Sequence, residues 1–84
     1  MEELVREIVE PMISNKAALM IKTVPALENE AAEIIVITDK ADTARLIGKG
    51  GSVANAIRKV ASVKARLNNE HIKVKFEKIN WKKT

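Results

Sequence analysis

All three glycines of this 84-residue chain fall within four positions, Gly48-Lys49-Gly50-Gly51. Glycine adopts positive φ angles and lets another molecule approach the backbone closely, so such a cluster indicates a place where the main chain itself binds a ligand. The pair Leu46-Ile47 precedes the cluster, and a helical pattern begins at Ser52. Because a helix N-terminus offers free N–H groups and a positive dipole end, the loop is expected to bind an anion such as a phosphate, to which Lys49 adds a charge.

The charge of the chain is divided unevenly between its two halves. Residues 1–42 carry four basic and nine acidic side chains, whereas residues 43–84 carry eleven basic side chains and two acidic ones. The glycine cluster opens this basic half, whose net charge is +9 within a total of +4. A field of this sign concentrates polyanions such as nucleic acids, although a basic half can also be no more than a solvated surface.

Composition excludes several classes of function. The chain has no cysteine and a single histidine, His71, so no disulfide framework, metal site or cofactor is expected. The acidic start Met1-Glu2-Glu3 lacks the apolar segment of a signal peptide, and no stretch has the length of a membrane span. We therefore expect a cytoplasmic protein without a membrane partner. The sequence contains no P-loop frame and no Ser/His/Asp or Cys/His constellation, so no enzyme is predicted.

Hydrophobic periodicity predicts three helices and three strands within one domain over residues 1–84, ordered over roughly 2–79 and followed by a basic tail at 80–84. In chain order, the segments are a helix over 2–14, a strand over 19–24, a strand over 33–38, a short helix ending at residue 46 or 47, a long helix over 52–67 and a strand over 72–77. The first two strands should form a hairpin with a polar turn at 28–30. Pro11 should bend or end the first helix, and Thr38 or Asp39 can cap the second.

The order α-β-β-α-α-β favours an α+β fold of two layers, in which a three-stranded sheet carries the helices on one face. The run from Glu33 to Thr38 is rich in β-branched residues and is expected to be the central strand. Its Ile35 and Ile37 lie on the sheet face opposite Ile34 and Val36. The long helix has an apolar pattern of the kind that packs on a core, formed by Val53, Ala56, Ile57, Val60, Val63 or Lys64, and Leu67.

A glycine cluster between a short helix and a longer one resembles the GXXG loop of KH domains, which bind single-stranded RNA or DNA. The stretch from Ile47 to Arg58 also matches every fixed position of the pattern I-G-K-x-G-x-x-A-x-A-I-R found in small bacterial single-KH proteins of the KhpA group. The resemblance covers nearly the whole chain. It implies a prokaryotic type II KH domain, because only about fifteen residues follow the long helix, enough for one strand and a tail.

The resemblance assigns roles to the residues around the loop. The backbone of Gly48 to Gly51 and the helix start at Ser52 would hold phosphates, with Lys49 adding a charge; the alternative is a tight interhelical turn that merely uses glycine. A groove for bases would run between the second and third helices on one side and the second strand on the other. Ile47 and Ala54, the groove residues nearest the loop, would contact the bases.

Two arginines are further candidates for RNA contacts. Arg58, nearly two turns into the long helix, and Arg45, beside the loop, could reach a base edge or a phosphate, or could be solvated residues of a helix face. The remaining groove floor would come from residues that mainly pack in the core, namely Leu46, Val53, Ile57 and the strand from Ile34 to Ile37. Phe76 is expected in the core, and His71 receives no role.

The resemblance implies a non-catalytic protein that binds single-stranded RNA, acts as an RNA chaperone or post-transcriptional regulator, and forms a homodimer or a heterodimer with another KH protein. Two alternatives remain open: a KH module of a transcription-elongation or ribosome-associated factor, and a protein-interaction module that has lost RNA binding. The chain has one Phe, one Trp and no Tyr, which excludes a platform that stacks bases on several aromatic rings. Trp81 is expected to pack on the domain or on a partner.

Overall fold

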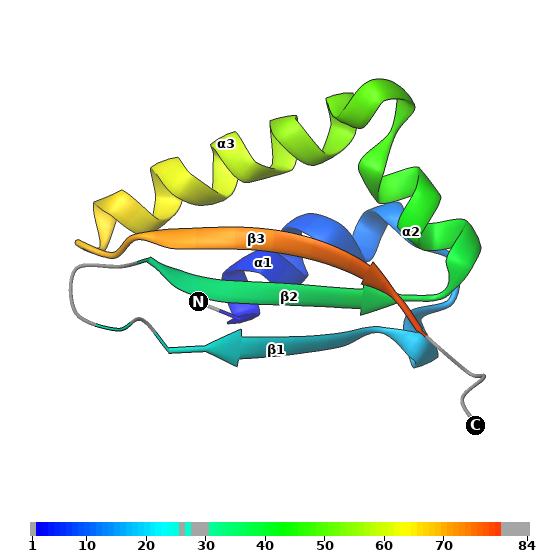
Figure 1. Cartoon of the computed structure of the whole chain (residues 1–84), viewed down its shortest axis with the longest axis horizontal. Helices are drawn as coiled ribbons and strands as arrows, with labels where there is room; N and C mark the ends of the chain where they lie inside the picture. Colours follow the sequence, from blue (N-terminus) through cyan, green and yellow to red (C-terminus); the bar gives the residue numbers. More distant parts are fainter. Residues whose placement is uncertain (1, 26, 28–30, 80–84) are drawn as a thin grey trace.

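The computed structural model describes residues 2–25, 27 and 31–79. Three helices and three strands follow one another in the predicted order α-β-β-α-α-β, which confirms the α+β fold (Figure 1). They are α1 (Glu2–Val9), β1 (Met20–Val24), β2 (Ala32–Thr38), α2 (Lys40–Ile47), α3 (Ser52–Leu67) and β3 (Ile72–Lys78). The predicted turn at 28–30 and the basic tail at 80–84 lie outside the described residues.

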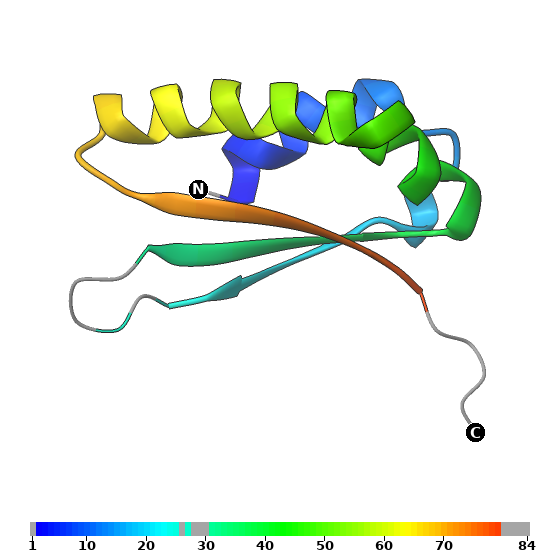
Figure 2. The same cartoon turned by 45° about the horizontal axis from the view of Figure 1, so that its top comes forward.

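The three strands form one mixed sheet in the order β1-β2-β3. β1 pairs antiparallel with β2, and Met20 lies opposite Ile37, so the predicted hairpin arrangement and the central place of β2 are confirmed. β2 pairs parallel with β3, from Ala32 opposite Ile72 to Thr38 opposite Lys78. The helices that the structure describes all cover the same face of this sheet (Figure 2), which leaves the other face open.

The first helix is shorter than the predicted range 2–14. α1 ends at Val9, and a 3-10 turn over Glu10–Met12 follows it. Pro11 lies in this turn, and it accounts for the early end, because proline has no N–H to donate and disfavours helical geometry in the residue before it. The prediction that Pro11 bends or ends the helix is confirmed, and the C-terminal limit of the helix is wrong.

Of the two residues considered as the cap of the second helix, the structure selects Asp39. Its side chain accepts a hydrogen bond of 2.9 Å from the backbone N–H of Asp42 and so satisfies one of the free donors of the first turn. Thr38 is fully buried instead, and its hydroxyl shares a hydrogen bond of 2.6 Å with that of Thr43. The helix ends at Ile47, within the predicted limits.

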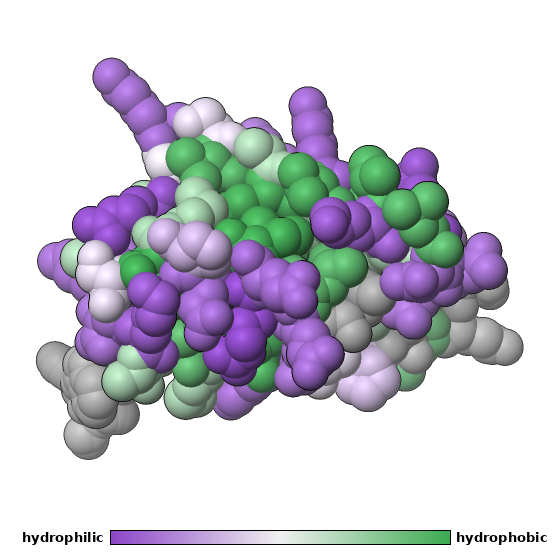
Figure 3. All heavy atoms as spheres, turned by 180° about the vertical axis from the view of Figure 1, so that it is seen from behind, coloured by the Kyte–Doolittle hydropathy of each residue, from purple (hydrophilic) through white to green (hydrophobic). Residues whose placement is uncertain are grey.

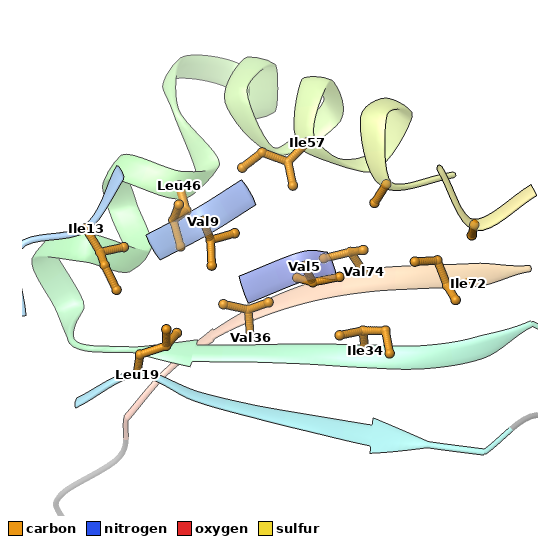
Figure 4. Close-up of a cluster of buried hydrophobic side chains, with 12 residues drawn as sticks. Val5, Val9, Ile13, Leu19, Ile34, Val36, Leu46, Ile57, Ile72 and Val74 are labelled. Atoms are coloured by element: carbon orange, nitrogen blue, oxygen red, sulfur yellow. The ribbon is translucent and has the colours of Figure 1, made fainter. Parts of the chain in front are cut away.

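The core lies between the helices and the covered face of the sheet (Figure 4). β2 contributes Ile34 and Val36, both with no exposed surface, and Ile35 and Ile37 are half-buried on the other face. The alternation expected of this strand is therefore confirmed. Ile34 and Val36 are packed against buried side chains from all three α-helices and from β3, including Val5, Val9, Leu46, Ile57, Ile72 and Val74.

The apolar pattern of α3 divides between two sides of the helix. The side facing the core carries Ala54, Ile57, Ala61 and Ala65. Val60, Val63 and Leu67, which the sequence grouped with Ile57, are instead 45%, 60% and 80% exposed. Three of the four core positions are alanines, so α3 can pack closely on the layer beneath, and the larger aliphatic side chains point away from it.

A buried carboxylate ties α2 to the segment that joins α1 to β1. The side chain of Asp42 is almost fully buried and accepts backbone hydrogen bonds of 2.9 Å from both Ser14 and Asn15. These two bonds lower the pKa of the carboxyl group below its ordinary value of 3.8 against the opposing effect of burial, and the charges of Arg45 and Lys16 lower it further. The ionised form is thus the one that the fold requires.

We predict that Asp42 makes folding stability depend on pH. Because its pKa is lower in the folded state, its contribution is present at neutral pH and is lost as the pH falls from about 5 through the folded pKa. Asp42→Asn, which puts an amide N–H₂ beside two backbone donors, should lower the free energy of unfolding at pH 7, and the gap between wild type and variant should narrow toward pH 3. Urea unfolding at several pH values measures this gap. Glu7→Gln, at an exposed carboxylate of α1, is the control, and a gap that does not change with pH would contradict the prediction.

Candidate nucleic-acid interface

The glycine cluster forms the turn between α2 and α3, and each of its glycines has a positive φ. The values are 74° for Gly48, 62° for Gly50 and 81° for Gly51. Gly48 closes α2 by donating a hydrogen bond of 2.9 Å to the carbonyl of Ala44. A tight turn over Lys49–Gly51, in which the N–H of Gly51 donates to the carbonyl of Gly48 at 3.2 Å, then leads into α3. The backbone conformation that glycine allows is therefore used at all three positions.

Packing distinguishes Gly48 from the other two glycines. A Cβ atom at Gly48 would lie 2.5 Å from Cγ2 and 2.9 Å from the backbone nitrogen of Val53. At Gly50 and Gly51 a Cβ atom would meet nothing within 4 Å. Gly48 is thus required by the turn itself, whereas the surface of the loop at Gly50 and Gly51 is open to another molecule. Lys49 and Ser52, on either side of this open backbone, are exposed.

A groove of about 360 Å³ runs between α3 and β3. It is lined by Arg58 and Ser62 of α3 and by Ile72, Lys73, Val74 and Lys75 of β3. The second strand, predicted to border the groove, does not reach it, because β2 is the central strand and its Ile34 and Val36 are fully buried. Parallel pairing places β3 at the edge of the sheet beside α3, and this strand takes the expected place of β2.

Arg58 is held in this groove by three contacts. Its Nε donates a hydrogen bond of 2.9 Å to the carbonyl oxygen of Val74, and its Nη1 donates one of 3.3 Å to Oδ1 of Asn55. The guanidinium carbon lies 5.6 Å from the centre of the Phe76 ring, within the range of a cation–π contact. Arg58 remains exposed on its outer side, so the groove contains a positive group that is both anchored and accessible.

Arg45 lies outside the groove. Its Nη1 donates hydrogen bonds of 2.9 Å to Oδ1 of Asp42 and to Oγ of Ser14, so its guanidinium faces the segment between α1 and β1. The ion pair with Asp42 leaves the Arg45 side chain 52% exposed.

The two apolar residues predicted beside the loop differ in accessibility. Ile47 is 37% exposed next to Gly48, whereas Ala54 is 2% exposed and covered by its neighbours. Leu46 and Ile57 belong to the core, and Val53 is half-buried against it.

Three residues that line the groove, Ser62, Lys73 and Lys75, were not predicted from the sequence. The alternation over residues 72–77 placed the lysines on a strand, but nothing in it showed that this strand borders α3. In the part of the chain that the structure describes, no three acidic or histidine side chains lie close enough together to hold a metal ion. Among the same residues, no helix combines the length and the hydropathy needed to cross a bilayer.

Two helices joined by a glycine loop, packed on a three-stranded sheet and bordering a basic groove, define a nucleic-acid-binding KH domain. The chain belongs to the KhpA/KhpB KH-domain family, because the family model described as "KhpA/KhpB, KH domain" matches residues 2–76. This match confirms the resemblance seen in the sequence. A comparison with curated proteins gives no match. Members of the KH class are binding modules, not enzymes.

We predict that alanine at Gly48 destabilises the fold and that asparagine at Gly50 is tolerated. Gly48 has φ 74° and ψ 176°, a region almost restricted to glycine, so Gly48→Ala should cost about 1–3 kcal/mol in strain alone, before the contact with Val53 is counted. Gly50 has φ 62° and ψ 19°, which asparagine adopts readily, so Gly50→Asn should cost less than about 1 kcal/mol. Urea unfolding followed by circular dichroism compares the two. Equal losses of unfolding free energy in the two variants would contradict the prediction, because neither the backbone strain nor the contact with Val53 would then set Gly48 apart.

Proposed function

We propose that this protein is a cytoplasmic, non-catalytic type II KH protein that binds single-stranded RNA and acts as an RNA chaperone or post-transcriptional regulator. The observation that carries the proposal is the open backbone of the loop at Gly50 and Gly51, which begins α3 at one end of a basic groove. The open backbone of the loop suits a phosphate, and the groove suits a base. Family membership supports nucleic-acid binding in general.

The backbone of the loop is proposed to hold the sugar-phosphate chain. The N–H of Ser52 already donates to the carbonyl of Lys49, so the donors proposed for a phosphate are the N–H groups of the next residues in the first turn of α3. These groups lie at the positive end of the helix and have no partner within it. Lys49 adds a mobile positive charge in the middle of the loop. Three of the four basic residues of α3, Arg58, Lys59 and Arg66, lie together with Ser62 on one side of the helix, and Lys64 lies apart from them. A strand of RNA that leaves the loop along this side stays in a positive field.

Bases are proposed to enter the groove between α3 and β3. Ile47 supplies apolar surface where the strand passes the loop, and Arg58 lies where a base meets β3. The buried Ala54 supports this surface from below, and Arg45 would contact a flanking phosphate with the exposed part of its side chain. A groove of this kind in KH domains accommodates about four nucleotides.

We predict that Lys49→Asp combined with Gly50→Asp abolishes binding of single-stranded RNA and leaves the fold intact. Two carboxylates would stand where phosphates pass, and a loss of about 1.4 kcal/mol is already tenfold in affinity. The fold should survive because Lys49 is exposed, a Cβ atom at Gly50 meets nothing, and aspartate tolerates a positive φ. Anisotropy titrations with a short single-stranded RNA and with the matching duplex, together with thermal unfolding, measure both properties.

The matched control is Lys64→Glu combined with Asn68→Asp. This pair removes one positive charge and adds two negative ones, as the loop variant does, at exposed positions near the far end of α3. It should weaken binding only slightly, since screening in 0.1 M salt acts over about 10 Å. Normal RNA binding by the folded loop variant would contradict the proposal. A wild type that binds no RNA would favour the protein-interaction alternative.

We also propose that the protein pairs with a second copy or with another KH protein through α3. Val60, Val63 and Leu67 form an exposed apolar stripe on the side of this helix that faces away from the core, whereas Arg58 and Ser62 line the groove with β3. Seen from behind, apolar surface gathers over the helical half of the molecule (Figure 3). Exposed patches of this kind favour protein association, and two linked grooves would raise the affinity for RNA without any new contact.

We predict that Val60→Glu produces a monomer. The carboxylate would stand in the middle of the apolar stripe, and because Val60 is exposed the folding stability should change by no more than about 0.5 kcal/mol. Ser62→Glu is the matched control: it adds the same charge two residues away on the groove flank, and so should keep the pairing while weakening RNA binding. Light scattering over a range of concentrations reports the oligomeric state. A wild type that is monomeric at every concentration, with no partner recovered from cells, would rule out the pairing.

A further inference from the structure

Where Arg58 meets β3, the groove presents the hydrogen-bond donors of a guanidinium group. Arginine has five N–H donors and no acceptor. Two of them are used, one on the carbonyl of Val74 and one on the side chain of Asn55. The other donors of the guanidinium remain for a ligand. These donors point in a fixed direction, because Nε and Nη1 of the guanidinium are both hydrogen-bonded and the group packs against Phe76.

The edge of β3 strengthens this bias toward donors. In a strand, the N–H and C=O of one residue point to the same side, and the carbonyl of Val74 points toward α3, away from β2. The N–H of Val74 therefore faces the groove as well. Its carbonyl, the acceptor that a base amino group would need, is already bound by Arg58. A ligand at this point meets donors from both walls, and the carbonyl of Val74 already accepts one hydrogen bond from Arg58.

We propose that Arg58 is a specificity-determining residue that selects a base with two neighbouring acceptors, which is guanine through O6 and N7 or cytosine through O2 and N3. The inference rests on the proposed RNA binding and deepens it. Adenine offers an amino group beside its acceptor, and uracil offers an N–H between its two carbonyls, so both bring a donor against donors. A bidentate contact of arginine with guanine is the commonest specific contact of this residue with a base.

Asn55 has a positioning role in this proposal. It lies one helical turn before Arg58 and accepts the hydrogen bond that holds Nη1, without itself lining the groove. Loss of Asn55 removes no charge from the protein and no group from the groove wall. It frees one end of the guanidinium, which can then turn toward any base or phosphate. Discrimination among bases should decline while general affinity is kept.

The test measures dissociation constants for fluorescently labelled single-stranded hexauridylate in which each position in turn carries guanosine, cytidine or adenosine. At one position of the hexamer, the oligonucleotide that carries guanosine, the one that carries cytidine, or both should bind about 5- to 150-fold more tightly than those that carry adenosine or uridine. Where guanosine is selected, 7-deazaguanosine, which lacks N7, should lose the gain and inosine, which keeps O6 and N7, should retain it. A gain from cytidine alone assigns the contact to its O2 and N3.

Variants separate selectivity from general affinity. Arg58→Lys keeps the positive charge but removes the guanidinium, and Asn55→Ala keeps Arg58 but removes the hydrogen bond that orients it. Both variants should reduce the ratio of dissociation constants between bases to near one. Lys59→Gln, at the next residue of the same helix, should weaken all oligonucleotides alike and leave the ratio unchanged. Equal binding of all four bases by the wild type, or a preference for adenosine, would overturn the inference and leave RNA binding in place. Absence of binding to any of these oligonucleotides would overturn the proposed function and the inference with it.

Discussion

The parallel pairing of β2 with β3 is the constraint on which the rest of this structure depends. Two parallel neighbours cannot be joined by a tight turn, so the chain must travel back along the sheet before β3 can begin. The unit formed by α2, the glycine loop and α3 is this return (Figure 1). Its 16-residue helix α3 spans about 24 Å at 1.5 Å per residue, enough to cover the length of a seven-residue strand.

The position of every candidate RNA contact follows from this return. The direction of the chain has to reverse between α2 and α3, which puts the glycine loop at one end of the sheet and the start of α3 beside it. Because β3 is added last and on the outside, its outer edge lies open along α3, and the groove forms there. The loop proposed to bind phosphates and the groove proposed to bind bases are thus two parts of one crossover, arranged along a single helix.

That helix also separates two kinds of surface. With 3.6 residues per turn, Arg58 and Ser62 fall on the side of α3 that faces the groove, and Val60 and Leu67 fall on the other side. Val63 lies between them and borders the same surface hollow as Lys59 and Arg66. Alanines occupy the side of the helix that faces the core. The proposed RNA contacts and the proposed pairing surface therefore lie on different sides of one 16-residue helix and adjoin at Val63.

Local signals in the sequence were sufficient for the order of elements and for the loop. A cap at Thr38 or Asp39, a terminator at Pro11 and three clustered glycines each act within a few residues, so their effect can be predicted from the chain; only the choice of Asp39 over Thr38 needed the structure. The strand that borders the groove could not be read in this way, because Lys73 and Lys75 have the same alternation whichever neighbour β3 chooses. The buried face of α3 was equally ambiguous: Ala61 and Val60 are both apolar, and only the spacing between the packed layers decides that the smaller one is inside.

The alanines on the buried side of α3 have a consequence for how this domain can diverge. Ala61 and Ala65 have no exposed surface, and their single methyl groups set how near the helix lies to the sheet. A valine at either position would push the helix outward and widen the groove, although neither residue lines it. The selectivity of such a domain can therefore drift through substitutions in its interior, with every residue of the binding surface unchanged.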